Sequence, residues 1–86
     1  MPSRRDTDRN ENKKPVPAER LIFAHNFRRA RKAAKLSQRA VKERTGFAQS
    51  WISEVETGKS PLNIDNMAEL AKSVDVPLWQ LLVPPL

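Results

Sequence analysis

The sequence predicts an all-α domain of five short helices packed around one core. Apolar residues recur at helical spacing in five consecutive segments, and residues typical of helix starts and stops separate these segments. No stretch shows the alternation of apolar and polar residues that is typical of a β-strand. The chain has 86 residues, of which 38% are hydrophobic, enough for one compact core but not for a large enclosed cavity.

A polar stretch precedes the predicted helices. Its composition is almost wholly polar and charged, so it cannot bury enough surface to offset the entropy of ordering it. We therefore expect a disordered arm over residues 1–17 and a folded domain over residues 18–86. The arm has two possible roles, a solubilising tail or the insertion of Arg4 and Arg5 into a DNA minor groove.

The first helix is expected from Pro17 to about Lys35. Proline suits the first helical position, and Glu19 in the first turn interacts favourably with the helix dipole. Residues at spacings of 4, 3 and 4 form its apolar face, namely Phe23, Phe27, Ala30 and Ala34.

Two short helices follow, Gln38 to Thr45 and Ala48 to about Glu56. Ser37 is a good N-cap for the first of them, and Gly46 suits the left-handed position at its end. The two helices can share one core while crossing steeply, through Val41, Phe47, Ile52 and Val55. This arrangement is a helix-turn-helix, in which the second helix projects from the body of the domain.

The last two helices are predicted near the C-terminal end. Asn63 can cap a fourth helix, whose apolar face consists of Ile64, Met67, Leu70, Ala71 and Val74. Pro77 can begin a fifth helix, which Pro84 and Pro85 would end. Its apolar residues are Leu78, Trp79, Leu81 and Leu82.

Positive charge is concentrated in the first third of the folded part. The chain carries 16 Lys and Arg against 10 Asp and Glu, a net charge of +6. Residues 20–44 contain nine basic residues and one acidic residue, whereas residues 45–86 contain more acidic than basic residues. A polyanion such as nucleic acid is therefore expected to bind residues 20–44.

The composition disfavours several function classes. The absence of cysteine excludes thiolate metal sites, disulfide scaffolds and cysteine nucleophiles, and a single histidine cannot build a His-rich metal site. Apolar runs are too short for a membrane span, and no signal peptide is evident. No Ser, His and Asp residues are spaced as a catalytic triad. We expect a cytoplasmic, nucleoid-associated protein that is not an enzyme and takes no metal, cofactor, membrane or small-molecule ligand.

The predicted helix 48–56 presents short or planar polar groups outward. Glutamine can bond adenine N6 and N7 together, glutamate can accept from cytosine N4 while repelling phosphates, and serine discriminates weakly. We therefore expect Gln49, Ser50 and Glu54 to contact DNA bases in the major groove, and Ser53 to be structural or phosphate-facing. The alternative for each is a solvated surface side chain.

Many residues between Ala24 and Leu82 match a known pattern at fixed spacing. They are Phe27, Arg28, Arg31, Leu36, Ser37, Gln38, Val41, Gly46, Ile52, Ser53, Glu56, Gly58, Ile64 to Met67, Leu70, Ala71 and Val76 to Leu82. On these residues the chain resembles the Cro/CI-type, XRE-like helix-turn-helix family of phage repressors and restriction-modification controller proteins. The resemblance implies a lambda-repressor-like five-helix fold and double-stranded DNA as partner. The family usually has a small residue where this chain has Lys42, whose stem we expect along the helix crossing with its charge in water.

The resemblance also implies individual roles. It places Gln49 at the exposed start of the recognition helix and gives Gln38 a phosphate contact and support of Gln49. It implies a partly buried ion pair between Arg31 and Glu56, with Arg31 also within reach of a phosphate. An aromatic residue often stands at the position of Trp51, so we count Trp51 among the base-reading residues, through a thymine methyl or a sugar-phosphate. Packing against the neighbouring helix or the arm is the equal alternative.

Helix ends and loops supply the other expected phosphate contacts. Free backbone N–H groups and the positive dipole end make the start of the helix 38–45 a natural phosphate site. The loop after the helix 48–56 can hold the strand backbone, with a solvated loop as the alternative. The predicted phosphate ligands are Ser37, Gln38, Arg39, Thr57, Lys59 and Arg31.

Apolar residues near the C-terminal end are candidates for a dimer interface. These are Trp79, Leu82 and Leu86, although Trp79 can alternatively close the core. A homodimer places two recognition helices about one helical turn apart on a palindromic operator, as expected of a repressor or self-regulating controller. The alternative function is an antitoxin-type interaction module of a toxin–antitoxin pair, although the arm lacks the apolar anchors of a typical disordered inhibitor.

Overall fold

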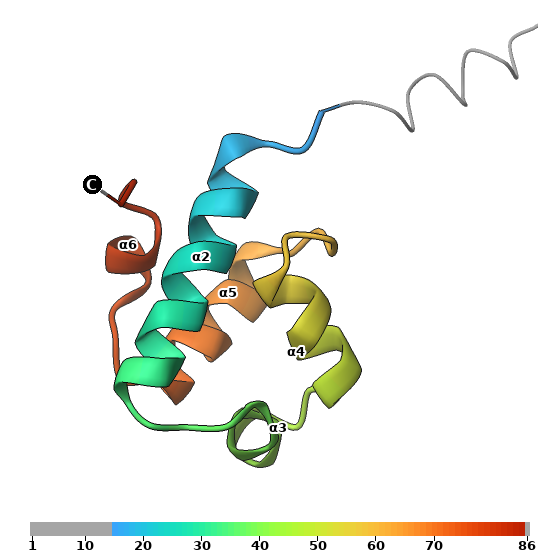
Figure 1. Ribbon diagram of the computed structural model, residues 1–86, viewed down its shortest axis with the longest axis vertical. Helices are drawn as coiled ribbons and strands as arrows, with labels where there is room; N and C mark the ends of the chain where they lie inside the picture. Colours follow the sequence, from blue (N-terminus) through green and yellow to red (C-terminus); the bar gives the residue numbers. More distant parts are fainter. Residues whose placement is uncertain (1–14, 86) are drawn as a thin grey trace, which may run out of the picture.

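The computed structural model describes residues 15–85, which form five helices and no strand (Figure 1). In chain order the helices are α2 (Ala18–Ala33), α3 (Gln38–Thr45), α4 (Gln49–Glu56), α5 (Ile64–Ser73) and α6 (Leu78–Leu81). The all-α, five-helix class predicted from the sequence is confirmed. The arm predicted at residues 1–17 lies outside the described residues except for its last three, and the predicted interface residue Leu86 lies outside them as well.

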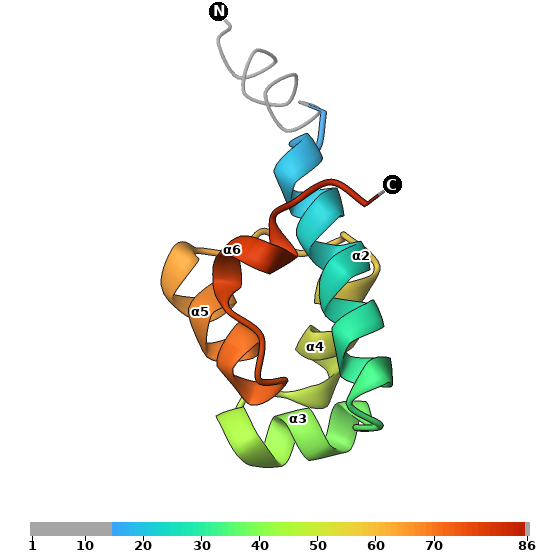
Figure 2. The same ribbon diagram turned by 90° about the vertical axis from the view of Figure 1, so that its left-hand side faces the viewer.

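The helices surround a single apolar core. The α2 helix runs between α6 on one side and α4 on the other, α3 crosses one end, and α5 and α6 lie side by side (Figures 1 and 2). Phe23 and Phe27 of α2 are fully buried, with their rings stacked and their centroids 5.9 Å apart. The other buried apolar residues are Ala24, Val41, Ile52, Val55, Leu70, Ala71, Val74 and Leu81.

The α2 helix ends two residues earlier than the sequence predicts. Lys35 adopts a left-handed conformation with φ 59, and its N–H donates to the carbonyl of Lys32 at 2.9 Å. The N–H of Leu36 donates to the carbonyl of Arg31 at 3.1 Å, which completes a Schellman motif. Because the chain turns here, Ala34 leaves the apolar face and is exposed, contrary to the expected helix face.

The same pair of hydrogen bonds ends α4 and α5. Gly58 has φ 76 after α4, and Asp75 has φ 61 after α5. The left-handed conformation costs a residue with a Cβ roughly 1–2 kcal/mol, so glycine is the preferred residue at this position. Of the three Schellman motifs, the one after α4 has glycine, and the other two use Lys35 and Asp75 at an energetic cost.

Side-chain caps fix the starts of α3 and α5. Ser37 Oγ accepts from the N–H of Ala40 at 3.0 Å, and Asn63 Oδ1 accepts from the N–H of Asn66 at 2.7 Å. The predicted apolar face of α5 is wrong at its first residue. Ile64 is the first residue of α5 and is 66% exposed, and the contact of this face with the core begins at Met67.

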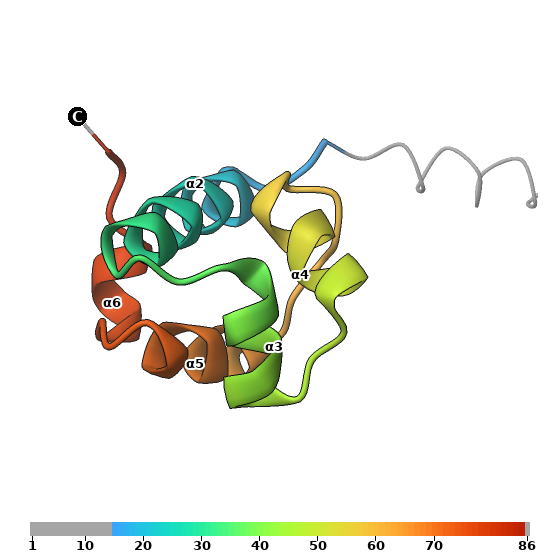
Figure 3. The same ribbon diagram turned by 60° about the horizontal axis from the view of Figure 1, so that its bottom comes forward.

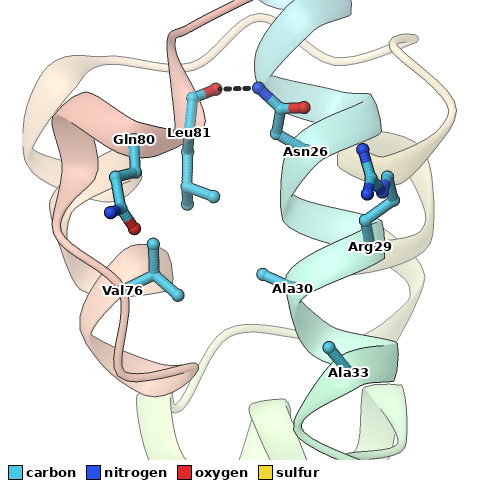
Figure 4. A pocket seen from close by; sticks show the side chains of 7 residues that line it. All are labelled: Asn26, Arg29, Ala30, Ala33, Val76, Gln80 and Leu81. Atoms are coloured by element: carbon cyan, nitrogen blue, oxygen red, sulfur yellow. Dashed lines mark hydrogen bonds between the residues drawn. The ribbon is translucent and has the colours of Figure 1, made fainter. Parts of the chain in front are cut away.

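The C-terminal segment is fastened to the middle of α2. Asn26 Nδ2 donates to the carbonyl oxygens of Leu81 at 3.0 Å and Val83 at 2.7 Å. Beside this tether, α2 and α6 border a shallow groove of about 320 Å³ (Figure 4). Its lining residues are Asn26, Arg29, Ala30, Ala33, Val76, Gln80 and Leu81. None of the helices over residues 15–85 has the length and apolarity required to span a membrane.

Replacing either strained C-terminal residue with glycine is expected to stabilise the fold. Lys35→Gly and Asp75→Gly each remove a Cβ from a left-handed position, which should raise the free energy of unfolding by about 1 kcal/mol. Urea unfolding followed by circular dichroism measures this change. Gly58→Ala is the opposing control, because it places a Cβ at a left-handed position with φ 76, and it should destabilise. A loss of stability in both glycine variants would contradict the assignment of strain.

Candidate nucleic-acid interface

The turn between α3 and α4 is held by local hydrogen bonds. Gly46 has φ 81, and its N–H donates to the carbonyl of Lys42 at 2.7 Å. The Thr45 hydroxyl donates to the carbonyl of Val41 at 2.8 Å and accepts from the N–H of Phe47 at 3.1 Å. These bonds set the direction in which α4 leaves α3 (Figure 3).

The α4 helix has one buried face and one exposed polar face. Ile52, Val55 and Glu56 are buried. The opposite side carries Gln49, Ser50, Ser53 and Glu54, all exposed. None of these four side chains forms a hydrogen bond or ion pair with another residue within 15–85, so their donors and acceptors are available to a ligand.

A buried polar network joins α2, α3 and the end of α4. Arg31 donates through Nε and Nη2 to both carboxylate oxygens of Glu56, with the Nη2–Oε1 distance at 2.9 Å. The two side chains are only 11% and 3% exposed. Gln38 Nε2 donates to the same Glu56 Oε1 at 3.1 Å, so one carboxylate anchors two other helices.

The third nitrogen of Arg31 is also engaged. Nη1 donates to the carbonyl of Leu36 at 2.8 Å, in the segment that leads into α3. Every guanidinium nitrogen of Arg31 therefore has a partner inside the protein, and the side chain has little exposed surface. This geometry favours a structural role for Arg31 over the phosphate contact expected from the resemblance.

Gln38 occupies the start of α3 and is half-buried. Its amide nitrogen has two hydrogens, and the bond to Glu56 uses one of them. One N–H is left for a phosphate oxygen. No hydrogen bond joins Gln38 to Gln49 within residues 15–85, so the expected support of Gln49 is not a direct contact in this structure.

Trp51 is half-buried between the turn and the loop that follows α4. Its ring lies 4.9 Å from the Phe47 ring at a tilt of 59°, and its Nε1 donates to Ser60 Oγ at 3.0 Å. Ser60 is itself buried. Trp51 therefore packs against Phe47 of the turn and Ser60 of the loop, which is one of the two roles left open by the sequence.

The loop after α4 combines a close backbone approach with exposed side chains. A Cβ on Gly58 would lie 2.7 Å from Leu21 Cδ2, so this loop packs tightly against α2. Lys59 is exposed. The Thr57 hydroxyl lies 3.2 and 3.1 Å from the carbonyl oxygens of Ser53 and Glu54, so its single hydrogen points to the helix end and not to solvent.

The remaining basic residues of α3 differ in their surroundings. Arg39 and Glu43 are exposed and lie 3.7 Å apart, a weak surface pair. Arg44 Nη1 donates to the carbonyl of Ser73 at 2.7 Å and so ties α3 to the end of α5. Lys42 is exposed, so its charge stays in water as expected. The crossing of α3 and α4 forms around the fully buried Val41.

Sequence reasoning missed several contacts that shape this surface. The tie between Arg44 and Ser73 and the bond from Trp51 to Ser60 join residues that no local pattern relates. The apolar character of Leu21 next to a helix start was the only sequence signal for its packing on Gly58.

The matches to known proteins agree with this geometry. The family model described as a helix-turn-helix domain matches residues 22–78. The chain belongs to the helix-turn-helix family. Its five-helix fold and its resemblance to restriction-modification controllers identify the Cro/CI-type, XRE-like class predicted from the sequence.

Relatives of this helix-turn-helix chain are transcriptional regulators by name. It is 32% identical over 65 residues to the uncharacterized HTH-type transcriptional regulator y4dJ of Sinorhizobium fredii, covering 76% of this chain and 84% of y4dJ. It is 30% identical over 81 residues to a hypothetical transcription factor of Neisseria meningitidis, covering 86% of this chain and 76% of that protein. Such regulators are typically not enzymes.

Two crystal structures share the fold. The hypothetical transcription factor NHTF from Neisseria superimposes with a TM-score of 0.73 at 28% identity, covering 84% of this chain and 86% of NHTF. The restriction-modification controller protein C.AhdI from Aeromonas hydrophila gives a TM-score of 0.70 at 28% identity, covering 76% of this chain and 98% of C.AhdI. The helix-turn-helix domain and these relatives indicate that the chain is a DNA-binding transcriptional regulator.

Removing the shared carboxylate should destabilise the domain strongly. Glu56→Ala leaves the buried Arg31 guanidinium without its bidentate partner, and we expect a loss of about 3–5 kcal/mol in the free energy of unfolding. Urea unfolding measures it. The double variant Arg31→Met with Glu56→Leu should lose much less than the sum of the losses in Arg31→Met and Glu56→Leu measured singly. Additive losses would show that the pair is not coupled.

Proposed function

We propose that this helix-turn-helix protein binds a palindromic operator as a homodimer, with α4 in the major groove, and represses transcription. The observation that carries the proposal is the exposed polar face of α4, together with the buried hydrogen bonds that hold its last residue, Glu56. Ile52 and Val55 fix one side of α4 in the apolar core, and Glu56 fixes its end through Arg31 and Gln38. A preorganised helix of this kind loses little freedom on docking.

Base recognition is assigned to Gln49, Ser50 and Glu54. Gln49 is the first residue of α4 and exposed, so its amide can extend past the helix end to an adenine edge. Ser50 and Glu54 are four residues apart and share one side of the helix. Glu54 would accept from a cytosine amine and reject sites at which it meets phosphate or an acceptor edge.

The phosphate contacts are assigned to the start of α3 and to the loop after α4. Ser37 caps the N–H of Ala40, so the N–H groups of Gln38 and Arg39 are left for an anion. Lys59 adds an exposed positive charge in the loop. The hydroxyl hydrogen of Thr57 points to helix carbonyls and is not available to a phosphate. Thr57 is therefore assigned to the phosphate site only through its position in that loop. We assign Arg31 a structural role, because three of its five N–H groups donate inside the protein and its side chain is 11% exposed.

Trp51 is assigned a positioning role. Its indole holds Ser60 and thereby the loop that carries Lys59. In this role it sets the distance between the base-reading helix and the phosphate-binding loop without reading a base itself.

The dimer contact is assigned to the surface of α6. Trp79 is 65% exposed, so the alternative in which it closes the core does not describe this structure. Leu82 is half-buried and Val83 is exposed, so together with Trp79 they supply the apolar surface of this segment. The Asn26 tether holds this segment in place against α2. A dimer lying over a promoter would repress by occlusion.

A binding selection from random duplex DNA at about physiological salt tests the proposal. A palindromic enriched motif would support a dimeric reader and give the half-site spacing. A single half-site would contradict the dimer. The absence of enrichment would contradict sequence-specific binding and favour the antitoxin-type interaction module.

Two single substitutions should separate base contacts from backbone contacts. Gln49→Ala is expected to relax preference at one base position by about 1–3 kcal/mol, because it removes a bidentate base contact. Lys59→Ala should weaken binding to all sequences alike, because phosphates carry no sequence information. Titrations against the selected duplex and single-base variants measure both effects. An unchanged preference in Gln49→Ala would remove Gln49 from the assigned readers.

Trimming the apolar segment of α6 should dissociate the dimer. Trp79→Ala is expected to raise the dimer dissociation constant at least tenfold, since it removes a large aromatic side chain from the proposed contact. Sedimentation equilibrium measures this constant. Ile64→Ala is a matched control, because Ile64 is equally exposed at 66% but lies on α5. Equal effects of both substitutions, or none, would contradict an α6 interface.

A further inference from the structure

One side of α2 carries basic residues that the helix-turn-helix itself does not use. Arg28 and Lys32 are exposed and four residues apart, so they lie on the same side of the helix. Leu21, seven residues before Arg28, shares that side. Because Leu21 packs on Gly58, this side of α2 faces the loop that follows α4.

The other end of this row lies beside the start of α3. Lys35 is exposed and comes two residues before Ser37. The intervening Leu36 is held by Arg31, which also holds the end of α4. The row formed by Arg28, Lys32 and Lys35 therefore runs from the loop that contains Lys59 toward the α3 N-terminus.

These three charges have no ion-pair partner among the residues that the structure describes, whereas Arg39 is paired with Glu43. At 1.5 Å per residue, Lys32 lies about 6 Å along α2 from Arg28, and Lys35 lies beyond the end of the helix. Successive phosphates of one strand advance about 3.4 Å along the duplex axis, so Arg28 and Lys32 can contact different phosphates.

Backbone strain provides a second, independent observation at Lys35. Its φ of 59 is the left-handed conformation at which glycine is preferred. A lysine side chain is present there despite the strain. Strain of this kind is a reason to look for a functional role of the side chain.

We propose that Arg28, Lys32 and Lys35 form a lateral phosphate track that binds the DNA backbone between the Lys59 loop and the start of α3. This inference rests on the proposed function and extends it from the helix-turn-helix to the outer side of α2. The track contributes affinity and salt dependence to every sequence and no base preference.

Salt titrations of charge-neutral variants test the track. The protein is titrated by fluorescence anisotropy against the selected duplex and a scrambled duplex, from low to moderate KCl. Arg28→Gln and Lys32→Gln should each reduce the slope of log K against log salt by about 0.9, equally on both duplexes. Arg29→Gln is the matched control, because Arg29 is the adjacent residue of equal charge but is one of the residues that line the groove between α2 and α6. Unchanged slopes, or an equal change in Arg29→Gln, would overturn the track.

The two glycine variants test Lys35 separately from folding. Lys35→Gly and Asp75→Gly should both raise Tm, and only Lys35→Gly should weaken binding, severalfold on both duplexes. Wild-type affinity in Lys35→Gly would remove this residue from the track. If the wild-type protein does not prefer the selected duplex, the proposed function fails. The slope differences between the variants still decide whether the α2 track exists.

Discussion

The bidentate pair of Arg31 and Glu56 is the constraint on which the surface of the domain depends. A buried ion pair adds little net stability relative to apolar packing, since desolvation offsets much of the attraction. The pair does fix the direction of α4 relative to α2 and α3. Glu56 is the last residue of α4, and its two oxygens receive bonds from α2 and α3 together. The orientation of the outward face of α4 is thus determined from its inner end.

In the proposed binding mode, the affinity for DNA and the discrimination between DNA sequences come from different parts of the domain. The exposed face of α4 carries no positive charge and includes Glu54, so α4 alone would be a poor ligand for a polyanion. Most basic residues within 15–85 belong to α2, α3 and the loop after α4. In the proposed binding mode, attraction comes from the surroundings of α4, and the choice among sequences comes from α4 itself. Such a division would make incorrect sites unfavourable without weakening general attraction to DNA.

Local features were predictable from the sequence, whereas long-range features were not. The caps at Ser37 and Asn63 and the turn at Gly46 follow from residue type, because each satisfies a nearby backbone group. The left-handed residue that ends α2 was missed, because lysine is not the residue expected in that conformation. The exposed face of α4 was predictable from periodicity. The engagement of Arg31 and the hold of Trp51 on Ser60 depend on how helices come together, which no local pattern specifies.

The two tryptophans of the chain, which has no tyrosine, provide intrinsic optical probes at two separate places. Trp51 is half-buried, hydrogen-bonded and in contact with Phe47, so its emission should be shielded from aqueous quenchers. Trp79 is 65% exposed on α6, so its emission should be red-shifted and readily quenched. Substitution of either tryptophan by phenylalanine leaves the fluorescence emission of the other tryptophan alone. Events at the helix-turn-helix and events at α6 can thus be followed separately in unlabelled protein.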